Sequence, residues 1–317
     1  MSSNYNTTIE FLRKRITDTN SLEAVLTSYM RTSGIFWIVT SLYLLGDLRD
    51  TDRTATEEII LSAQNEDGGW GGAMYHDSHI TTTASAIQAL AVVGSLDKLS
   101  DAQKLKCCEY IGSLQQEDGS FRGDTSLEID TRFAYCAVLV LKILNMNSLD
   151  AFIDVEKLLS WFDRCQNEDG VFGQRPDSES HGAQLFTVLA ALKLINNLET
   201  LKMRPEIIYF IKERQTPSGG FAGRPSKKPD CCYSWWLGAS LAILEAENYV
   251  DLEALRAYIF TCLDQEDGGF SDRPEDQPDV YHTFFALMPL ALLKLEPFPE
   301  VSPEFALPIE ICKKLNS

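Results

Sequence analysis

One short motif recurs along the chain and limits the folds that are open to it. QNEDGGW begins at Gln64, QQEDGSF at Gln115, QNEDGVF at Gln166, QTPSGGF at Gln215 and QEDGGF at Gln265, so the glutamines lie 51, 51, 49 and 50 residues apart. Five copies at so regular a spacing indicate stacked supersecondary units. Each copy predicts a turn, because Asp-Gly and Gly-Gly pairs adopt backbone conformations that other residues resist.

Apolar runs follow every motif after a polar stretch. Their length and small-residue content favour buried helices, which we expect at 82–93, 132–144, 183–195, 233–244 and 283–293. The stretches 154–165 and 252–263 are amphipathic and predict outer helices. Helix-start signals stand at Met203-Arg204-Pro205 and at Asp251.

Each unit is therefore predicted to be a helical hairpin of roughly 50 residues, and 34–46 adds one inner helix without a full motif before it. Five or six such hairpins can close into an all-α double ring of inner and outer helices; an open solenoid is the alternative. No linker or composition break divides the 317 residues, so we expect one domain, 1–317.

The charge balance excludes several classes of partner. The chain has 28 Lys+Arg against 46 Asp+Glu, a net charge of −18, which argues against nucleic acid and against docking on an anionic membrane. No apolar run has the length of a transmembrane span, and Met1 to Thr17 lacks the apolar core of a signal peptide. Eight cysteines without a secretory signal predict reduced thiols and a cytoplasmic location.

Polar residues gather where the inner helices are predicted to start. Nine positions after each motif aromatic stand His79, Asp130, His181, Asp230 and Asp279. In a closed ring these starts surround one mouth. Helix capping explains each aspartate individually, but it does not explain the Cys, His, Tyr and Arg residues beside them.

Three of these residues form a candidate metal site. Asp230 and Cys232 are two positions apart at one helix start, and His282 lies 50 residues further on, in the next hairpin. Three O, S and N ligands with an open fourth position are typical of a catalytic zinc. The alternative is a capping aspartate, a buried cysteine and a core histidine. We predict one zinc ion per chain.

A basic segment precedes these ligands. Residues 204–230 contain six Lys+Arg and three Asp+Glu, and Arg224, Lys227 and Lys228 lie just before Asp230. His181 opens the previous hairpin. Basic groups and helix N-termini beside a metal favour an anionic ligand such as a diphosphate, whereas the alternative is a solvated loop.

Aromatic residues fall on the predicted inner helices, where they either fill the core or line an apolar cavity. They are Trp37, Tyr135, Trp235, Trp236, Tyr281, Phe284 and Phe285. A metal site, an anion site and an apolar cavity together suggest transfer from an isoprenoid diphosphate.

The stretch 219–236, GGFAGRPSKKPDCCYSWW, resembles the zinc and diphosphate segment of protein prenyltransferase β subunits. Its matching positions are Arg224, Lys227, Asp230, Cys232, Tyr233 and Trp236. DVYHT at Asp279 matches the family's histidine ligand, and SESHGAQ at Ser178 matches its diphosphate-binding histidine.

The resemblance extends from about Ser33 to Pro308. It is strongest to the β subunit of the type II (Rab) geranylgeranyltransferase, on GIFW at Gly34, EIDTRFAYCAV at Glu128, CYSWW at Cys232 and VSPEFALP at Val301. Two stretches depart from the family pattern, HITTTAS at His79 and QTPSGG in the fourth motif.

This resemblance implies an all-α, α/α toroid, that is, an α6–α6 double-ring barrel of helical hairpins. It also implies a catalytic β subunit with a partner α subunit, and an escort protein that presents Rab GTPases for geranylgeranyl transfer from geranylgeranyl diphosphate to C-terminal cysteines. Asp230, Cys232 and His282 would hold zinc, and His181, Arg224, Lys227 and Tyr233 would stabilise the departing diphosphate. Trp236, Tyr135 and Phe285 would line the isoprenoid cavity, with Arg132 and His79 near the peptide end.

Two further positions bear on the choice of donor and cation. Ser33 and Ala84 are small where the farnesyl enzyme has bulky aromatics, which leaves room for a 20-carbon chain. Asp272 takes the place where the farnesyl enzyme binds magnesium and the type I enzyme carries a lysine, so Mg²⁺ is a second candidate cofactor and type I is disfavoured.

Other functions are compatible with parts of this sequence. A type I geranylgeranyl- or farnesyltransferase β subunit would act on CaaX proteins. A terpene cyclase shares the helical ring but needs an Asp-x-Asp-Asp cluster, which the sequence lacks. A helical scaffold without catalytic activity is the non-enzymatic alternative. His76-x-x-His79 is a candidate for a second metal site.

Overall fold

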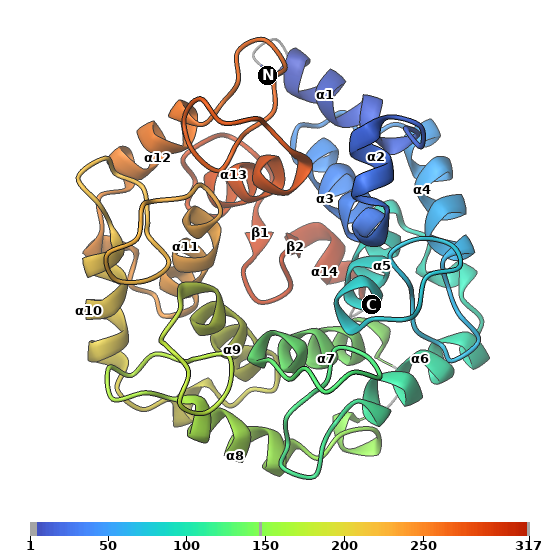
Figure 1. The fold of residues 1–317 in the computed structure, drawn as a ribbon, viewed down its shortest axis with the longest axis horizontal. Coiled ribbons are helices and arrows are strands. Elements are labelled where there is room, and N and C mark those ends of the chain that lie inside the picture. Colours follow the sequence, from blue (N-terminus) through green and yellow to red (C-terminus); the bar gives the residue numbers. More distant parts are fainter. Residues whose placement is uncertain (1–4, 146–147, 316–317) are drawn as a thin grey trace.

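Two concentric rings of helices make up the chain in the computed structural model, which describes residues 5–145 and 148–315 (Figure 1). The inner helices are α3 (Arg31–Leu44), α5 (Ile80–Val93), α7 (Thr131–Leu144), α9 (Gly182–Leu194), α11 (Tyr233–Ile243) and α13 (Val280–Leu292). Each packs against the next, and α13 packs against α3. The ring is therefore closed, as predicted, and the open solenoid is excluded.

The outer helices alternate with the inner ones along the chain and lie outside them. They are α1 (Asn6–Ile16), α4 (Asp50–Ser62), α6 (Asp101–Ser113), α8 (Val155–Cys165), α10 (Arg204–Arg214) and α12 (Leu252–Thr261). Inner helices are apolar on every side and almost wholly buried, as in α9, whereas α8 buries one face only. This division follows from the sequence pattern, since only a helix that is apolar all round is stable between two layers.

Short helical segments connect the two rings. These are α2 (Leu22–Leu26) and the 3₁₀ segments η2 (Ser28–Met30), η3 (Leu96–Lys98), η4 (Leu149–Ala151), η5 (Leu198–Thr200) and η6 (Glu247–Tyr249).

The recurring motif forms the predicted turn and also fastens one hairpin to the next. Gly219 has a φ of +92°, and a Cβ atom there would collide with the Ala254 carbonyl at the start of α12, so only glycine fits. The Gln215 side chain accepts a hydrogen bond from the Asp251 N–H at 2.8 Å and donates one to the Asp251 carbonyl at 2.7 Å. The motif glutamine thus holds the start of the next outer helix.

Helix α1 completes the outer ring, which was not predicted from the sequence. The fifth turn places Gly268 against the backbone of Thr7 and Thr8, and Gly269 against the ring of Phe11. In the fourth repeat the same two glycines contact α12. The N-terminal helix therefore serves as the outer helix for the last hairpin.

The fifth turn differs from the register that Gln265 predicts. The motif glutamine Gln64 forms a bridge with Trp70, but in the fifth repeat Leu263 is the partner of Phe270. The turn is one residue longer, and Gln265 lies inside it. The alignment of this motif on its glutamine was wrong, whereas the alignment on its aromatic residue holds.

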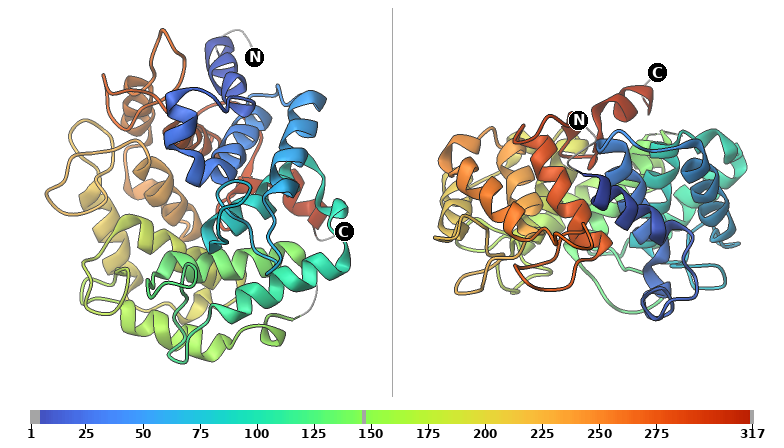
Figure 2. Two further views of the ribbon diagram at one scale, coloured as in Figure 1. Left: turned by 45° about the vertical axis from the view of Figure 1, so that its right-hand side comes forward. Right: turned by 90° about the horizontal axis from the view of Figure 1, so that it is seen from above.

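A C-terminal segment covers one end of the barrel. It contains β1 (Val301–Ser302), β2 (Leu307–Pro308), paired antiparallel, and α14 (Ile309–Leu315). Tyr135 Oη donates to the Glu304 carbonyl at 3.0 Å, and Gln88 Nε2 donates to the Phe305 carbonyl at 2.9 Å. The right-hand view of Figure 2 shows this segment at one end of the rings and the long loops at the other. The mouth formed by the motif loops is therefore the open end.

None of the helices in the described ranges combines the length and apolarity that a membrane crossing requires. The single domain over 1–317 stays a prediction, and residues 1–4, 146–147 and 316–317 of that range lie outside the described residues.

Candidate functional site

The starts of the inner helices carry side-chain caps at the mouth. Asp130 and Asp279 accept hydrogen bonds from the first turns of α7 and α13. His79 and His181 cap α5 and α9 in the same way through Nδ1. Capping, which the sequence predicted for the aspartates, therefore extends to these two histidines and fixes the direction of their rings.

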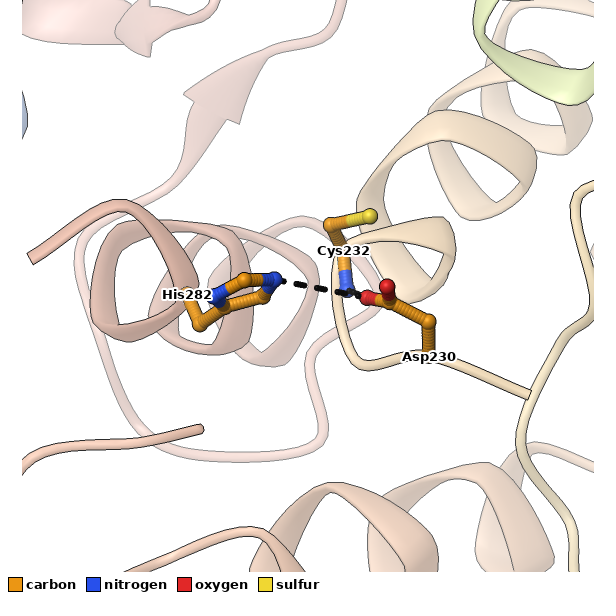
Figure 3. Close-up of side chains that lie close together, drawn as sticks. All are labelled: Asp230, Cys232 and His282. Atoms are coloured by element: carbon orange, nitrogen blue, oxygen red, sulfur yellow. Dashed lines mark hydrogen bonds and ion pairs between the residues drawn. The ribbon is translucent and has the colours of Figure 1, made fainter. Parts of the chain in front are cut away.

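Asp230, Cys232 and His282 converge from two neighbouring hairpins (Figure 3). Cys232 immediately precedes α11, and Asp230 Oδ1 accepts a hydrogen bond from its N–H at 2.8 Å. His282 is in the first turn of α13, and the ligand atoms of the three residues lie within 4.8 Å of one another. In the described part of the chain this is the one group of three or more His, Cys, Asp or Glu side chains so placed.

The geometry fits a zinc ion. His282 Nε2 lies 3.5 Å from Asp230 Oδ1. Nitrogen and oxygen ligands that are each about 2.1 Å from one zinc, at a tetrahedral angle, lie about 3.4 Å apart. The donor set of one thiol, one imidazole and one carboxylate also matches the preference of zinc, and three protein ligands leave one position open.

Asp279 orients the histidine ligand. His282 Nδ1 donates to Asp279 Oδ2 at 2.7 Å, which directs Nε2 toward Asp230 and Cys232. Burial lowers the pKa of His282, but hydrogen bonds to Asp230, Asp279 and Cys232 outweigh it and raise that pKa to about 12. Surroundings that favour a proton so strongly also favour a metal cation in its place.

The other two ligands differ in their titration. Burial opposes ionisation of Asp230, but hydrogen bonds with His282 and Cys232 lower its pKa below the usual value, so it is a carboxylate. Burial raises the pKa of the Cys232 thiol to about 12, against the opposing influence of His282. Metal binding would therefore release a proton from this thiol.

A cavity of about 270 Å³ with basic walls adjoins the metal ligands. Its lining residues are Gly223, Arg224, Lys227, Lys228, Asp230, Tyr233 and Arg273. Arg224 Nη1 also pairs with Glu179 Oε2 at 3.0 Å, in an exposed ion pair that contributes little stability. The predicted anion-binding residues Arg224, Lys227 and Tyr233 thus share one cavity.

His181 stands beside this cavity as a neutral donor. Its Nδ1 accepts the Ala183 N–H at 3.1 Å, so the ring proton is on Nε2, which lies 3.1 Å from Tyr233 Oη. Burial and then the charge of Arg224 lower the pKa of His181 to about 4. A neutral imidazole that donates to Tyr233 leaves the tyrosine O–H free to donate to an anion.

Arg273 was not predicted as a site residue. It stands three positions after the motif aromatic Phe270, as Arg224 stands three positions after Phe221. The third position after the motif aromatic therefore signals this residue, in the same register as the ninth and later positions that gave the predicted site residues.

The predicted isoprenoid residues form a continuous series of ring contacts on the inner helices. Tyr135 contacts Phe186 (5.6 Å between ring centroids), Phe186 contacts Trp236 (5.3 Å), and Trp236 contacts Phe285 (4.6 Å). Tyr281 joins the series through Phe285 at 4.5 Å. Phe186, which was not predicted, links the two halves of this wall.

A larger cavity, of about 490 Å³, opens at the rim between α2, α3 and the start of α13. Trp37 and Tyr281 are among its lining residues and lie edge to face with centroids 5.1 Å apart. Asp279 also lines it, so this apolar space borders the metal site.

The small residues proposed for the pocket floor are buried on neighbouring inner helices. Ser33 lies on α3 and Ala84 on α5, and Ser33 Oγ is 2.9 Å from Ser85 Oγ. Asp272 lies in the loop before α13, where its Oδ2 is 3.5 Å from Arg273 Nη1.

The residues proposed for the peptide end form other contacts. Arg132 is paired with Asp130 across the start of α7. His79 packs its ring edge to face on Phe133. His76 and His79 belong to no group of three or more metal-binding side chains within the described residues, so nothing supports a second metal site there.

Comparisons with known proteins agree with this geometry. Residues 4–307 match the family model of the prenyltransferase alpha-alpha toroid domain. The chain is 38% identical over 264 residues to the geranylgeranyl transferase type-2 subunit beta of Saccharomyces cerevisiae, covering 81% of this chain and 79% of that protein. It is 41% identical over 257 residues to the Candida albicans protein of the same name, covering 77% and 74%.

A solved structure shows the same fold. The Candida albicans protein geranylgeranyltransferase-I complexed with GGPP superimposes with a TM-score of 0.85 at 23% identity, covering 99% of this chain and 98% of that chain.

Proposed function

Because this chain belongs to the prenyltransferase alpha-alpha toroid family and is a protein prenyltransferase β subunit, we propose that it transfers a geranylgeranyl group from geranylgeranyl diphosphate to C-terminal cysteine thiols of Rab GTPases. One observation carries the proposal: the Asp230, Cys232 and His282 group adjoins a basic cavity of about 270 Å³. The names of the two type-2 relatives support the choice of a geranylgeranyl donor.

Asp230, Cys232 and His282 would hold zinc, which would supply a lowered pKa for the substrate thiol in the open position. In the transfer, a bond forms between that sulfur and the first carbon of the isoprenoid while the bond from this carbon to the diphosphate oxygen breaks. The thiol proton leaves to solvent, and the electron pair of the broken bond stays on the diphosphate.

The basic cavity would act on the leaving group. Lys227 and Arg224 present positive charge where negative charge grows on the diphosphate, and Tyr233 presents a hydroxyl. Neutral His181 donates a hydrogen bond to the oxygen of that hydroxyl and so fixes its position. Magnesium at Asp272 would add to this neutralisation.

The remaining residues would set the lipid and protein specificity. Tyr135, Trp236 and Phe285 would contact the isoprenoid, and the small Ser33 would leave space for 20 carbons. The partners in this proposal are a prenyltransferase α subunit and an escort protein that presents the Rab. A cytoplasmic location is also part of it.

Co-expression with a candidate α subunit, followed by competition between the 15- and 20-carbon diphosphates, tests the proposal. We expect a complex with about one zinc per β chain and transfer of the 20-carbon group to an escort-bound Rab. A complex that lacks zinc, or that modifies CaaX peptides in preference to Rab, would refute the type II assignment.

Two variants sharpen this test. Cys232→Ala should lose both zinc and turnover, whereas the adjacent buried Cys231→Ala should keep its zinc and serves as the matched control. Lys227→Ala should slow the chemical step more than it weakens binding of the protein substrate.

A further inference from the structure

Two loops of neighbouring hairpins are joined at the wall of the basic cavity. The Cys231 N–H donates to the Asp272 carbonyl at 2.8 Å, which ties the loop before α11 to the loop before α13. Arg273, the next residue, reaches back across this junction, and its Nε donates to the Pro229 carbonyl at 3.3 Å. The side chain of one hairpin therefore lies on the anion-binding loop of the other.

The position of Arg273 adds to the charge of that cavity. Arg224, Lys227 and Lys228 come from the loop of the fourth repeat, and Arg273 lines the same space from the fifth. Asp230, the carboxylate in the lining, faces His282 in the metal group. A cavity with four cationic side chains, drawn from two hairpins, fits an anion of high charge that is contacted from both sides.

Two contacts hold the guanidinium of Arg273 and leave some of its N–H donors available. Nε is bound to the Pro229 carbonyl, and Nη1 lies 3.5 Å from Asp272 Oδ2. A guanidinium carries five N–H donors in a rigid fork, so these two contacts fix its plane and leave other donors for a phosphate oxygen. The side chain is 43% exposed, which keeps it accessible to a ligand in the cavity.

The same register position carries an arginine in three repeats, but only two of these arginines line the cavity. Arg175, Arg224 and Arg273 each stand three positions after a motif aromatic, in the third, fourth and fifth repeats. Arg224 and Arg273 line the cavity on the two hairpins that supply the metal ligands, whereas Arg175 is exposed and is not among the lining residues.

We propose that Arg273 is a further residue of the diphosphate site, which donates to the leaving diphosphate from the side opposite Arg224 and Lys227. As the carbon–oxygen bond breaks, the electron pair remains on the diphosphate, and Arg273 neutralises part of that charge. This inference rests on the proposed function, and it adds a contact from the hairpin of His282 to those from the hairpin of Cys232.

The test uses the zinc-loaded complex with its α subunit and compares Arg273→Gln with Arg175→Gln. Single-turnover transfer measures the chemical step, and inorganic diphosphate is the binding probe. Arg273→Gln should slow single turnover about 10- to 100-fold and weaken diphosphate binding about tenfold. Zinc content should be unchanged, and Arg175→Gln should match the wild type in all three measurements.

An Arg273→Lys variant separates the charge from the loop contact. Lysine keeps the charge but lacks the fork that reaches Pro229, so it should recover most of the lost rate. If Arg273→Lys is as slow as Arg273→Gln, or if Arg273→Gln loses zinc, the residue only supports the loop and the inference is overturned. Wild-type rate and affinity in Arg273→Gln would also overturn it, while a wild-type complex that transfers no geranylgeranyl group would instead refute the proposed function.

Discussion

Asp279→Asn changes one atom of the carboxylate that orients His282, and its effect on zinc can be worked out from two hydrogen bonds. Oδ1 of Asp279 accepts the His282 N–H at 2.8 Å, and Oδ2 accepts from Nδ1 at 2.7 Å. Asparagine has one accepting oxygen. If that oxygen caps the helix, an NH₂ group faces Nδ1; if the amide flips, the cap is lost.

Either arrangement weakens the metal site, because the flipped amide also replaces a charged acceptor at Nδ1 with a neutral one. When an NH₂ group faces Nδ1, Nδ1 has to accept a hydrogen bond and therefore cannot carry a proton. The proton of the neutral His282 ring then lies on Nε2, which is the atom that must bind zinc. Loss of such a partner typically costs 10- to 100-fold in metal affinity, or about 1.4–2.7 kcal/mol. We therefore expect Asp279→Asn to bind zinc about 10- to 100-fold more weakly than the wild type.

Competition with a zinc chelator of known affinity measures this change in the assembled complex. Asp251→Asn is the matched control, because Asp251 caps the outer helix α12 through the Ala254 N–H at 2.9 Å and contacts no proposed ligand. The control should bind zinc as the wild type does. A zinc affinity of Asp279→Asn within twofold of the wild type would refute the role that we give to this carboxylate.

Three further changes test other parts of the site. In Gly223→Ala the new methyl group would overlap the Tyr233 ring and move its hydroxyl away from His181, so affinity for inorganic diphosphate should fall about tenfold, and an unchanged affinity would contradict the contact. Ser33→Trp should shift donor competition toward the 15-carbon diphosphate, because Ser33 is 7% exposed on an inner helix; unchanged preference would remove its role in chain length. Because burial lowers the pKa of His181 from 6.5 to about 4, the unfolded chain takes up a proton that the folded chain does not, and stability should fall as the pH drops from about 6.5 to 4. The melting temperature should therefore fall more in the wild type than in His181→Asn between pH 7 and pH 5, and equal falls would argue against a depressed pKa.

Much of the architecture could be predicted because every repeat forms the same helical hairpin, so the pattern of one repeat predicts the arrangement of the others. A single register from the motif aromatic placed His79, Asp130, His181 and Asp279 at four helix starts, and all four cap their helices. Apolar content separated inner from outer helices, since burial between two layers leaves no polar face.

The features that were not predicted depend on contacts between distant segments. Helix α1 follows no motif, and its place in the outer ring depends on its packing against α3 and α4 and against the fifth turn. Gln265 was aligned with the motif glutamines because the sequence alone does not show that this turn is one residue longer. The bridge between Leu263 and Phe270 shows it.

The site shows the same division. Asp230, Cys232 and His282 were recognisable because their residue types limit the chemistry, and the structure brings them together. Arg273 has an ordinary surface residue type, and only the junction of two loops at Cys231 and Asp272 makes it a wall of the cavity. The rim cavity beside Trp37 likewise lies between α2 and two inner helices that are far apart in the sequence.

Ring closure removes the weak ends that a linear array of repeats has. In an open array the terminal units have one neighbour and fray first, whereas here every inner helix is packed between two others. The joint made by α1 lies over the turn at Gly268, which leads into the helix that carries His282. A substitution that disrupts the first helix would therefore also disturb the position of His282, although the two are far apart in the sequence. The N-terminal helix closes the ring that holds the metal ligands.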